Sequence, residues 1–331
     1  MPSGEGGTAL SVLDWLLDAD PSVRWQVLKD VMDAPEAEVN RERARVASEG
    51  LGARLLAMQA SDGSWGGAAW NRGWDSTMHV LMLLRDLGLN PASDEARHAL
   101  SLVRGHVTFE GWGPGGGDNP FFKGEGEPCI NGQIAAVGAY FGQDVSSLID
   151  RLLGEQLPDG GWNCETENGS VRSSFNTTMC VLEALFHYEA NACPDSAVRE
   201  ARLRGQEYLL ERRLFRRLST GAIIDRDRKG GGAWTDFAFP TWWHYDVLRG
   251  LDYFWRVGAY PDSRLSEAIK LVQSKCDADG RWRMDVIYPG RMPVAIDDGQ
   301  GRPSRWNTLR ALRVLAWYQA PLEGRAHGAR E

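Results

Sequence analysis

The sequence lacks long hydrophobic runs. No segment approaches the roughly 20 consecutive apolar residues that a membrane-spanning helix needs. The first ten residues, MPSGEGGTAL, lack the charged start and apolar centre of a secretory leader. We therefore expect a cytoplasmic protein without an integral membrane segment.

Cysteine is scarce, and positive charge is not in excess. Five cysteines, an odd number in a chain of 331 residues, argue against a disulfide framework. The formal net charge of −8 argues against a nucleic-acid partner. The hydrophobic content of 43% allows a large core.

Strand-like alternation is also scarce, whereas apolar residues at helical spacing are frequent. This pattern predicts twelve helices that follow one another as six pairs. The predicted pairs cover 11–20 with 23–32, 53–59 with 75–88, 95–107 with 131–142, 145–156 with 176–190, 199–215 with 245–258, and 264–276 with 307–319.

Many of the 14 tryptophans and 38 glycines cluster in the loops between these helices. An Asp-Gly-x-Trp turn occurs three times, as QASDGSW (59–65), QLPDGGW (156–162) and CDADGRW (276–282). Asp-Gly favours a turn, and tryptophan packs a large face beneath it. We expect Trp65, Trp162 and Trp282 to be structural.

The second helix of each pair opens with a large apolar residue followed by a carboxylate or amide. A short acceptor there suits an N-cap or first-turn position. The six openings are Trp25-Gln26, Trp74-Asp75, Ile130-Asn131, Phe175-Asn176, Tyr245-Asp246 and Trp306-Asn307.

Six such hairpins can close into an all-α, α6/α6 toroid with the second helices inside. We expect one toroid domain over residues 1–331, with its core at about 8–320. The N-termini of the inner helices then gather at one end, where we expect the functional site.

The QxxDGxW form of the first two turns resembles the repeat of squalene/hopene cyclases and protein prenyltransferases. Four further segments resemble bacterial single-toroid proteins that are labelled as prenyltransferases or squalene cyclase repeats and have no defined reaction. These segments are EPCINGQ (127–133), DGGWNCE (159–165), RSSFNTTM (172–179) and FPTWWHYDVLRGLDYF (239–254). The resemblance implies a toroid in which Gln and Trp tie an outer helix to the adjacent turn. Proteins with one fold can catalyse different reactions, so the resemblance indicates the fold more closely than it indicates the reaction.

Protonation-initiated cyclases of this family carry an Asp-x-Asp-Asp motif whose middle Asp is a strong acid at the mouth of an inner helix. None of the six openings has Asp at that position, so a hopene-type cyclisation is disfavoured. The one adjacent Asp pair is Asp297-Asp298, before the last helix. We predict it as a general acid or cation ligand; a turn before Gly299 is the alternative.

The family's prenyltransferases hold zinc with Asp, Cys and His near inner-helix N-termini. Here Cys129 and His244 each directly precede an opening pair, and Cys164 lies in the loop before the fourth inner helix. We predict Cys129, Cys164 and His244 as zinc ligands, with Asp246 as a further ligand or as the group that orients His244. Ordinary packing of the cysteines and histidine is the alternative.

The same mouth carries aromatic, amide and cationic side chains. The predicted substrate-binding residues are Trp74, Asp75, Asn131, Asn176, Tyr245, Trp306 and Arg305. Aromatic faces would steady a carbocation, and Arg305 with the loop cations Arg226, Arg228 and Lys229 would hold an isoprenoid diphosphate. Core packing and solvated charges are the alternatives.

These patterns favour a terpenoid cyclase-like or prenyltransferase-like enzyme that takes a lipophilic, isoprenoid substrate in a central funnel, with zinc assistance. Asp246, Asp297 and Asp298 are the predicted catalytic carboxylates. Two alternatives stay open: a zinc-dependent hydrolase or lyase on a non-terpenoid substrate, and a non-catalytic module that binds a hydrophobic ligand.

Overall fold

The computed structural model describes residues 11–191, 195–224 and 233–319. The predicted cations Arg226, Arg228 and Lys229 lie outside these ranges. The described residues are mainly helical, as predicted. The α-helices are α1 (Val12–Leu17), α2 (Pro21–Asp30), α3 (Glu36–Ala44), α4 (Gly50–Ala57), α5 (Thr77–Leu87), α6 (Asp94–His106), α7 (Pro128–Tyr140), α8 (Ser146–Gly154), α9 (Phe175–Asn191), α10 (Ser196–Glu211), α11 (Val247–Arg256), α12 (Ser266–Ser274) and α13 (Arg305–Gln319). A two-stranded ribbon joins β1 (Thr108–Phe109) to β2 (Asn119–Pro120).

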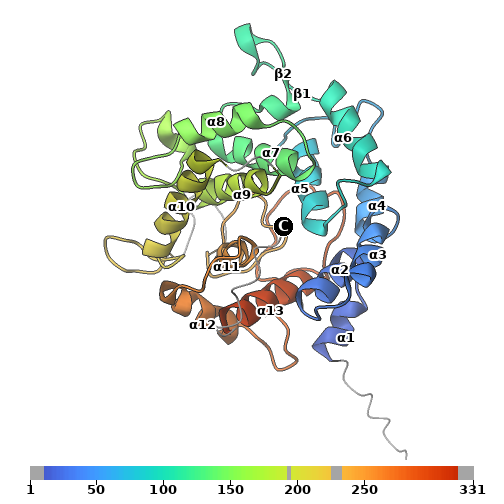
Figure 1. Ribbon diagram of the computed structural model, residues 1–331, viewed down its shortest axis with the longest axis vertical. Helices are drawn as coiled ribbons and strands as arrows, with labels where there is room; N and C mark the ends of the chain where they lie inside the picture. Colours follow the sequence, from blue (N-terminus) through green and yellow to red (C-terminus); the bar gives the residue numbers. More distant parts are fainter. Residues whose placement is uncertain (1–10, 192–194, 225–232, 320–331) are drawn as a thin grey trace, which may run out of the picture.

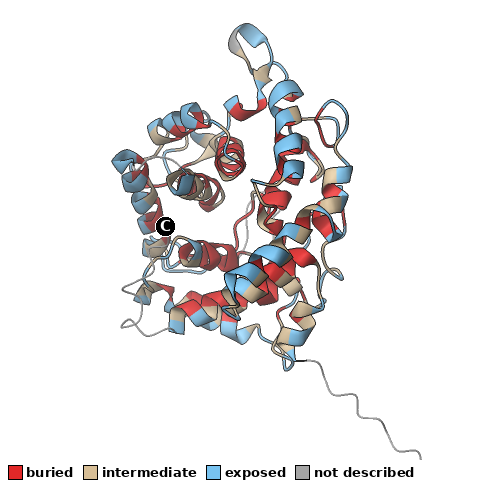
Figure 2. Cartoon of the chain, turned by 45° about the vertical axis from the view of Figure 1, so that its right-hand side comes forward, coloured by how far each residue is buried: buried red, intermediate tan, exposed pale blue. Residues whose placement is uncertain are grey.

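The helices form a double ring, which confirms the toroid (Figure 1). The inner ring contains α2, α5, α7, α9, α11 and α13, and the partner helices α1, α4, α6, α8, α10 and α12 lie outside it. The ring closes between its first and last inner helices, where Arg313 of α13 donates to Gln26 and pairs with Asp30 of α2 at 2.8 Å. The buried side chains concentrate on the inner helices and on the inward faces of the outer ones (Figure 2).

Two local predictions were wrong. The helix α3 is missing from the predicted set because its sequence, EAEVNRERA, buries only Val39 and has almost no apolar period. The helix α2 begins at Pro21, four residues before the predicted opening, because Asp20 caps it by accepting from the Ser22 N–H at 2.9 Å.

The three tryptophan turns fasten outer helices. The indole N–H of Trp65 donates to the Leu55 carbonyl in the last turn of α4 at 2.7 Å. Trp162 donates to Leu152 of α8, and Trp282 to Val272 of α12. Each indole therefore ties the adjacent turn to a carbonyl in the last turn of an outer helix, and the structural role expected for these tryptophans is confirmed.

The glutamines of the first two turns link neighbouring outer helices. The Gln156 side-chain N–H group donates to Gly160 O at 2.7 Å and to Ala201 O of α10 at 2.8 Å. Gly160 has φ +94°, and a Cβ there would lie 2.6 Å from the Arg204 carbonyl, so the close approach requires glycine. Cys276 occupies the glutamine position of the third turn.

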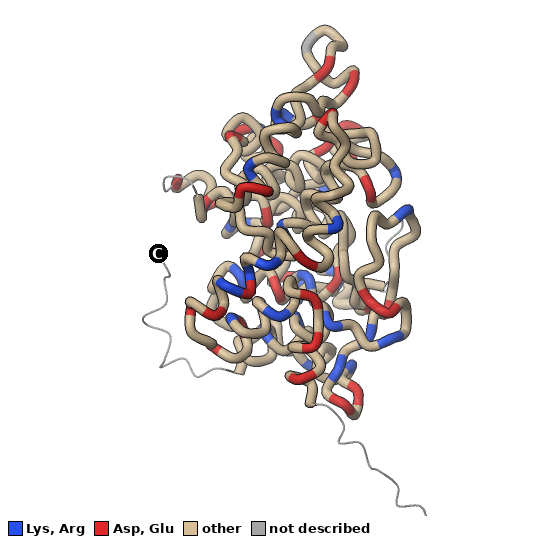
Figure 3. The backbone as a smooth tube through the Cα atoms, turned by 90° about the vertical axis from the view of Figure 1, so that its right-hand side faces the viewer, with Lys and Arg blue, Asp and Glu red and all other residues tan. Residues whose placement is uncertain are grey.

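Charged residues of both signs are interspersed along the backbone (Figure 3). Within the described ranges, no helix combines the length and the apolar character needed to cross a bilayer.

We expect Gln156→Leu to lower the free energy of unfolding by about 1–3 kcal/mol, because two carbonyls lose their donor. Urea denaturation measures this loss. The matched control is Cys276→Leu, at the corresponding position of the third turn, which should shift stability by no more than about 0.5 kcal/mol. Equal losses in the two variants would contradict the fastening role.

Candidate functional site

The centre of the ring is filled by the chain itself. Residues 237–246, which we call the plug segment, enter between the inner helices, and most of their side chains are buried. Trp242 stacks on Trp74 with ring centroids 5.1 Å apart, and Phe239 stacks on Trp306 at 4.2 Å. The cavity that remains at the centre has a volume of only about 30 Å³. This is far below the roughly 300–1,000 Å³ of ligand pockets. A central funnel that holds the substrate stays a prediction.

The predicted amide residues hold loop backbone. Asn131 accepts from the Glu125 N–H at 2.8 Å and donates to the Glu125 carbonyl at 2.9 Å. Asn176 accepts from the N–H of Tyr245 in the plug segment at 2.8 Å. These contacts satisfy backbone groups inside the protein, and a role of Asn131 and Asn176 in substrate binding stays a prediction.

Asp246 and Tyr245 are also buried. The Asp246 carboxylate caps α11 by accepting from the Arg249 N–H at 2.7 Å, and it also accepts from the Ala238 N–H at 3.3 Å. Burial raises the pKa of Asp246 and that of the Tyr245 hydroxyl. The Tyr245 ring packs against Phe175 and Trp234. Asp246 therefore anchors the plug segment, and its catalytic role stays a prediction.

The remaining predicted residues are spread around the mouth. Asp75 forms an ion pair with Arg291. The Arg305 guanidinium lies 4.8 Å from the ring centroid of Trp15 on α1. Asp297 accepts from the Ser304 hydroxyl at 2.6 Å, and burial raises its pKa to about 6, whereas Asp298 is exposed.

Two of the predicted zinc ligands do come together. Cys129 lies in the first turn of α7, and Cys164 begins a short 3₁₀ turn, Cys164–Thr166. With Glu127 they form a group whose ligand atoms all lie within 4.8 Å of one another. Sequence reasoning missed Glu127, although it stands only two residues before Cys129.

His244 does not belong to this group, and its role as a third ligand stays a prediction. Its imidazole is stacked between Trp243 and Tyr288, with ring centroids 3.7 Å and 3.6 Å away. Trp74 packs edge-on against it at 6.3 Å. Aromatic packing in the plug therefore fixes the orientation of this ring.

The donor set fits zinc. Two sulfurs and one carboxylate, with a fourth position open, match the ligand types and the three-ligand pattern of catalytic zinc sites. The Cys129 thiol donates to Glu127 Oε2 at 3.6 Å, and the Cys164 sulfur lies 3.3 Å from the Thr177 hydroxyl. The hydrogen bond with Cys164 and burial raise the pKa of Cys129, so a metal that bound here at neutral pH would displace a proton from this thiol.

A pocket of about 490 Å³ lies beside this group. Its walls come from the first tryptophan turn, the ribbon β1–β2 with the loop inside it, and the start of α7. The pocket is lined by Asp62, Ser64, Gly67, Ala68, Ala69, Trp70, His106, Val107, Thr108, Phe109, Glu110, Trp112, Glu125, Glu127 and Ile130. Glu127 therefore belongs to both the pocket wall and the metal-type cluster.

The pocket combines open aromatic faces with carboxylates. Trp70 and Trp112 are 41% and 57% exposed, unusually high values for tryptophan. Trp112 lies across Gly126, where a Cβ would come within 2.7 Å of the indole. Glu125, which also lines the pocket, is buried, and burial raises the pKa of its carboxyl group. One of its carboxylate oxygens accepts from the Glu127 N–H at 2.6 Å.

No family model and no curated protein matches the sequence. Solved structures similar to this chain include the type II terpene cyclase MstE from Scytonema. A variant of MstE with geranylgeranyl dihydroxybenzoate aligns at 15% identity and a TM-score of 0.44, covering 90% of this chain and 86% of MstE. The apo form aligns at 16% identity and a TM-score of 0.43, covering 88% and 85%. Similarity at this level specifies neither substrate nor reaction.

The raised pKa of Asp297 makes stability depend on pH. The folded pKa of about 6 exceeds the roughly 3.9 of an unfolded aspartate, so the folded state binds the proton more tightly. The contribution of Asp297 to stability is therefore present below about pH 4 and is lost as pH rises through about 6, by up to about 2–3 kcal/mol.

We expect Asp297→Asn to flatten this part of the pH profile, as measured by urea denaturation at pH 4 and pH 7.5. The exposed neighbour gives the control, because Asp298→Asn should keep the wild-type profile. Parallel curves for wild type and Asp297→Asn would show that the half-buried carboxyl of Asp297 does not titrate as described.

Proposed function

We propose that the chain is an enzyme that acts on a lipophilic, isoprenoid-type substrate in the 490 Å³ pocket, with a zinc ion held by Glu127, Cys129 and Cys164. One observation carries the proposal: a donor set of catalytic-zinc type shares a residue, Glu127, with the wall of a pocket of ligand size.

The zinc position differs from that in the sequence-based prediction. Glu127 takes the place assigned to His244, which is held in aromatic packing. Zinc bound at this group would supply a Lewis acid with one open coordination position. The Thr177 hydroxyl lies 3.3 Å from the Cys164 sulfur, and this hydrogen bond would orient the sulfur as a ligand.

The pocket walls suit an apolar chain. Trp70, Trp112, Phe109 and Ile130 offer flat aromatic and aliphatic surface, and the two tryptophans gain most from being covered. Indole faces also stabilise a positive charge that develops on a bound hydrocarbon. These walls replace the central aromatics Trp74 and Trp306, whose faces are stacked against the plug segment.

Glu125 is the group best placed to hold a proton in this pocket. Its carboxyl is buried, and burial raises its pKa, which favours the neutral acid relative to an exposed glutamate. The N–H of Glu127 donates to one of its oxygens and fixes its orientation. Glu125 is therefore the proposed proton donor at the apolar wall.

A second candidate is a zinc-dependent hydrolase or lyase on a non-terpenoid substrate. The carboxylates Asp62, Glu110, Glu125 and Glu127 all line the pocket, and this lining favours a ligand with a cationic or hydroxyl-rich head. The zinc ligands are the same in both candidates, so the nature of the bound ligand separates them.

We expect the purified protein to bind about one zinc ion per chain, measured by elemental analysis and competition with a chelating dye. Cys129→Ser and Cys164→Ser should weaken binding by more than about 100-fold, beyond the 10–100-fold effect of removing an outer-shell partner. Glu127→Gln should weaken it less.

Two variants serve as controls for the zinc measurement. His244→Ala should keep zinc, because His244 is not part of the group and its ring is stacked on Tyr288. Cys276→Ser removes an exposed cysteine outside the group. Zinc loss in His244→Ala with full retention in Cys164→Ser would overturn the ligand assignment.

We expect farnesol and geranylgeraniol to bind the protein, and Trp112→Ala to weaken that binding about tenfold through loss of apolar contact. Calorimetry measures both, and Tyr260→Ala, which removes an exposed aromatic outside the pocket lining, is the matched control. Tight binding of a long-chain amine without binding of either alcohol would favour the second candidate.

A further inference from the structure

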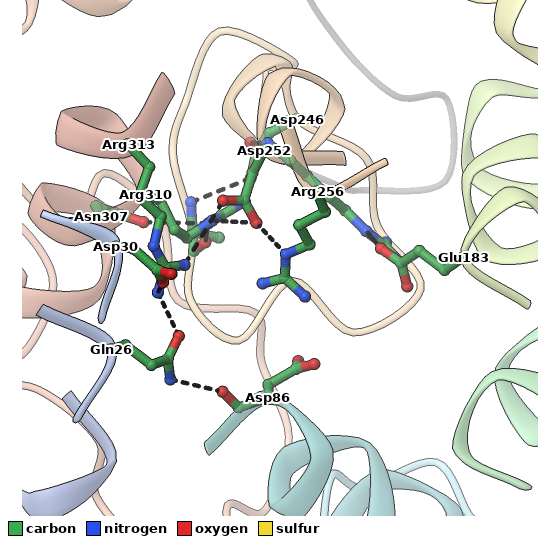
Figure 4. Close-up of polar contacts among 12 residues, drawn as sticks. Gln26, Asp30, Asp86, Glu183, Asp246, Asp252, Arg256, Asn307, Arg310 and Arg313 are labelled. Carbon is green, nitrogen blue, oxygen red and sulfur yellow. Dashed lines mark hydrogen bonds and ion pairs between the residues drawn. The ribbon is translucent and has the colours of Figure 1, made fainter. Parts of the chain in front are cut away.

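The small central cavity is built from charged side chains. It lies among α5, α9, α11 and α13 and the plug segment, and it is separate from the 490 Å³ pocket. Its charged lining residues are Arg85, Asp86, Glu183, Arg249, Asp252, Arg256 and Arg310. Figure 4 shows part of this network, including the Asp252–Arg256 pair on α11.

Most of these charges have partners. Arg249 pairs with Glu183 through two contacts of 2.9 Å and 3.0 Å and also donates to the carbonyls of Trp242 and His244. Although Glu183 is buried, Arg249 and Arg85 lower its pKa to about 2, so its carboxylate is ionised at neutral pH. Arg85 Nη2 also lies 3.5 Å from Glu183 Oε2, so two arginines share this carboxylate.

The lining as a whole carries an excess positive charge. Four arginines (85, 249, 256 and 310) face three carboxylates (86, 183 and 252), which leaves 4 − 3 = +1. Behind them, Arg313 and Asp30 form an ion pair at 2.8 Å and cancel. The buried carboxyl of Asp246 also interacts with Arg249 and Arg310; burial raises its pKa, which favours the neutral form relative to an exposed aspartate. Burial lowers the pKa of His187, which also lines the cavity, to about 3, so it adds no charge at neutral pH.

One guanidinium has an unused donor. Arg85 is 5% exposed, and its Nε and Nη2 atoms contact Asp86 at 2.9 Å and 2.8 Å. Its Nη1 is buried and has no hydrogen-bond partner among the described residues. An unpaired charged donor in the interior is costly. The cavity wall also holds an acceptor without a hydrogen bond among the described residues, Asp252 Oδ1, which lies 3.8 Å from Arg313 Nη1.

The cavity also has an accessible side. The Arg256 side chain remains 32% exposed while its Nε pairs with Asp252 at 2.9 Å. Because Arg256 stands in the last turn of α11, and Arg85 in the last turn of α5, this opening faces the C-terminal ends of the inner helices.

From the charge excess, the unused Arg85 donor and the cavity size, we infer that the centre of the toroid binds the carboxylate group of a small molecule, between Arg85 and Arg256. A volume of about 30 Å³ holds roughly two water-sized groups, which matches the two oxygens of a carboxylate. A single negative charge balances the excess, and guanidinium groups match carboxylates geometrically. This site is independent of zinc.

Calorimetry on the full-length protein tests the site, with sodium formate, sodium acetate and sodium phosphate as probes at pH 7.5 and constant ionic strength. We expect formate and acetate to bind one per chain and more tightly than phosphate, whose tetrahedral dianion exceeds both the volume and the charge. Arg85→Gln and Arg256→Gln should each weaken formate binding by about 10-fold to 100-fold.

Arg97→Gln is the matched control, because Arg97 pairs with Asp94 on the outer surface. The Arg97→Gln variant should bind formate as tightly as wild type does. If the Gln variants fail to fold, Arg256→Lys keeps the charge and should still weaken binding. An absence of carboxylate binding to wild type, a preference for phosphate, or an equal loss in Arg97→Gln would each overturn the proposal.

Discussion

The structure depends on how the hole of the helical ring is filled. Six inner helices around an axis leave a space that must be packed, and here residues 237–246 pack it. Buried polar side chains anchor this plug segment through its backbone: Asn176 holds Tyr245, Asn307 holds Phe237, and Arg249 holds Trp242 and His244. Since unpaired backbone groups are costly in a dry interior, these anchors fix one conformation of the segment.

The plug divides the molecule into two chemically different regions. At the edge, where α7 begins, carboxylates and open indoles surround a pocket beside two thiols. At the centre, a small cavity is enclosed by arginines and carboxylates with one positive charge in excess. Only the first region has the volume of a ligand pocket, so the proposed chemistry is placed at the rim of the toroid.

Local patterns predicted the ring well, because helix periodicity and turn residues act over a few positions. The same register brought Cys129 and Cys164 into one group, since both stand at mouths of neighbouring inner helices. Glu127 was missed because it stands outside the repeated opening pair. The stacking of His244 on Tyr288 was not predicted, because Tyr288 is distant in sequence and a single sequence does not reveal such a contact.

The position of the plug segment was not predicted either, because it also depends on contacts between residues that are distant in sequence. Trp74 and Trp306 stand at helix openings, where sequence reasoning placed them beside a substrate. Their partners Trp242 and Phe239 come from a loop whose path is set by long-range contacts with Asn176 and Asn307. Residue type and spacing alone did not distinguish aromatic residues facing a ligand from aromatic residues facing the chain.

The central claim is that Glu127, Cys129 and Cys164 form a zinc site at the wall of the pocket. X-ray absorption spectroscopy at the zinc edge of the metal-loaded protein tests it most directly. The account predicts two sulfur ligands at about 2.3 Å, oxygen ligands at about 2.0–2.2 Å, and no imidazole scattering. A shell without sulfur, or one that contains imidazole, would contradict it.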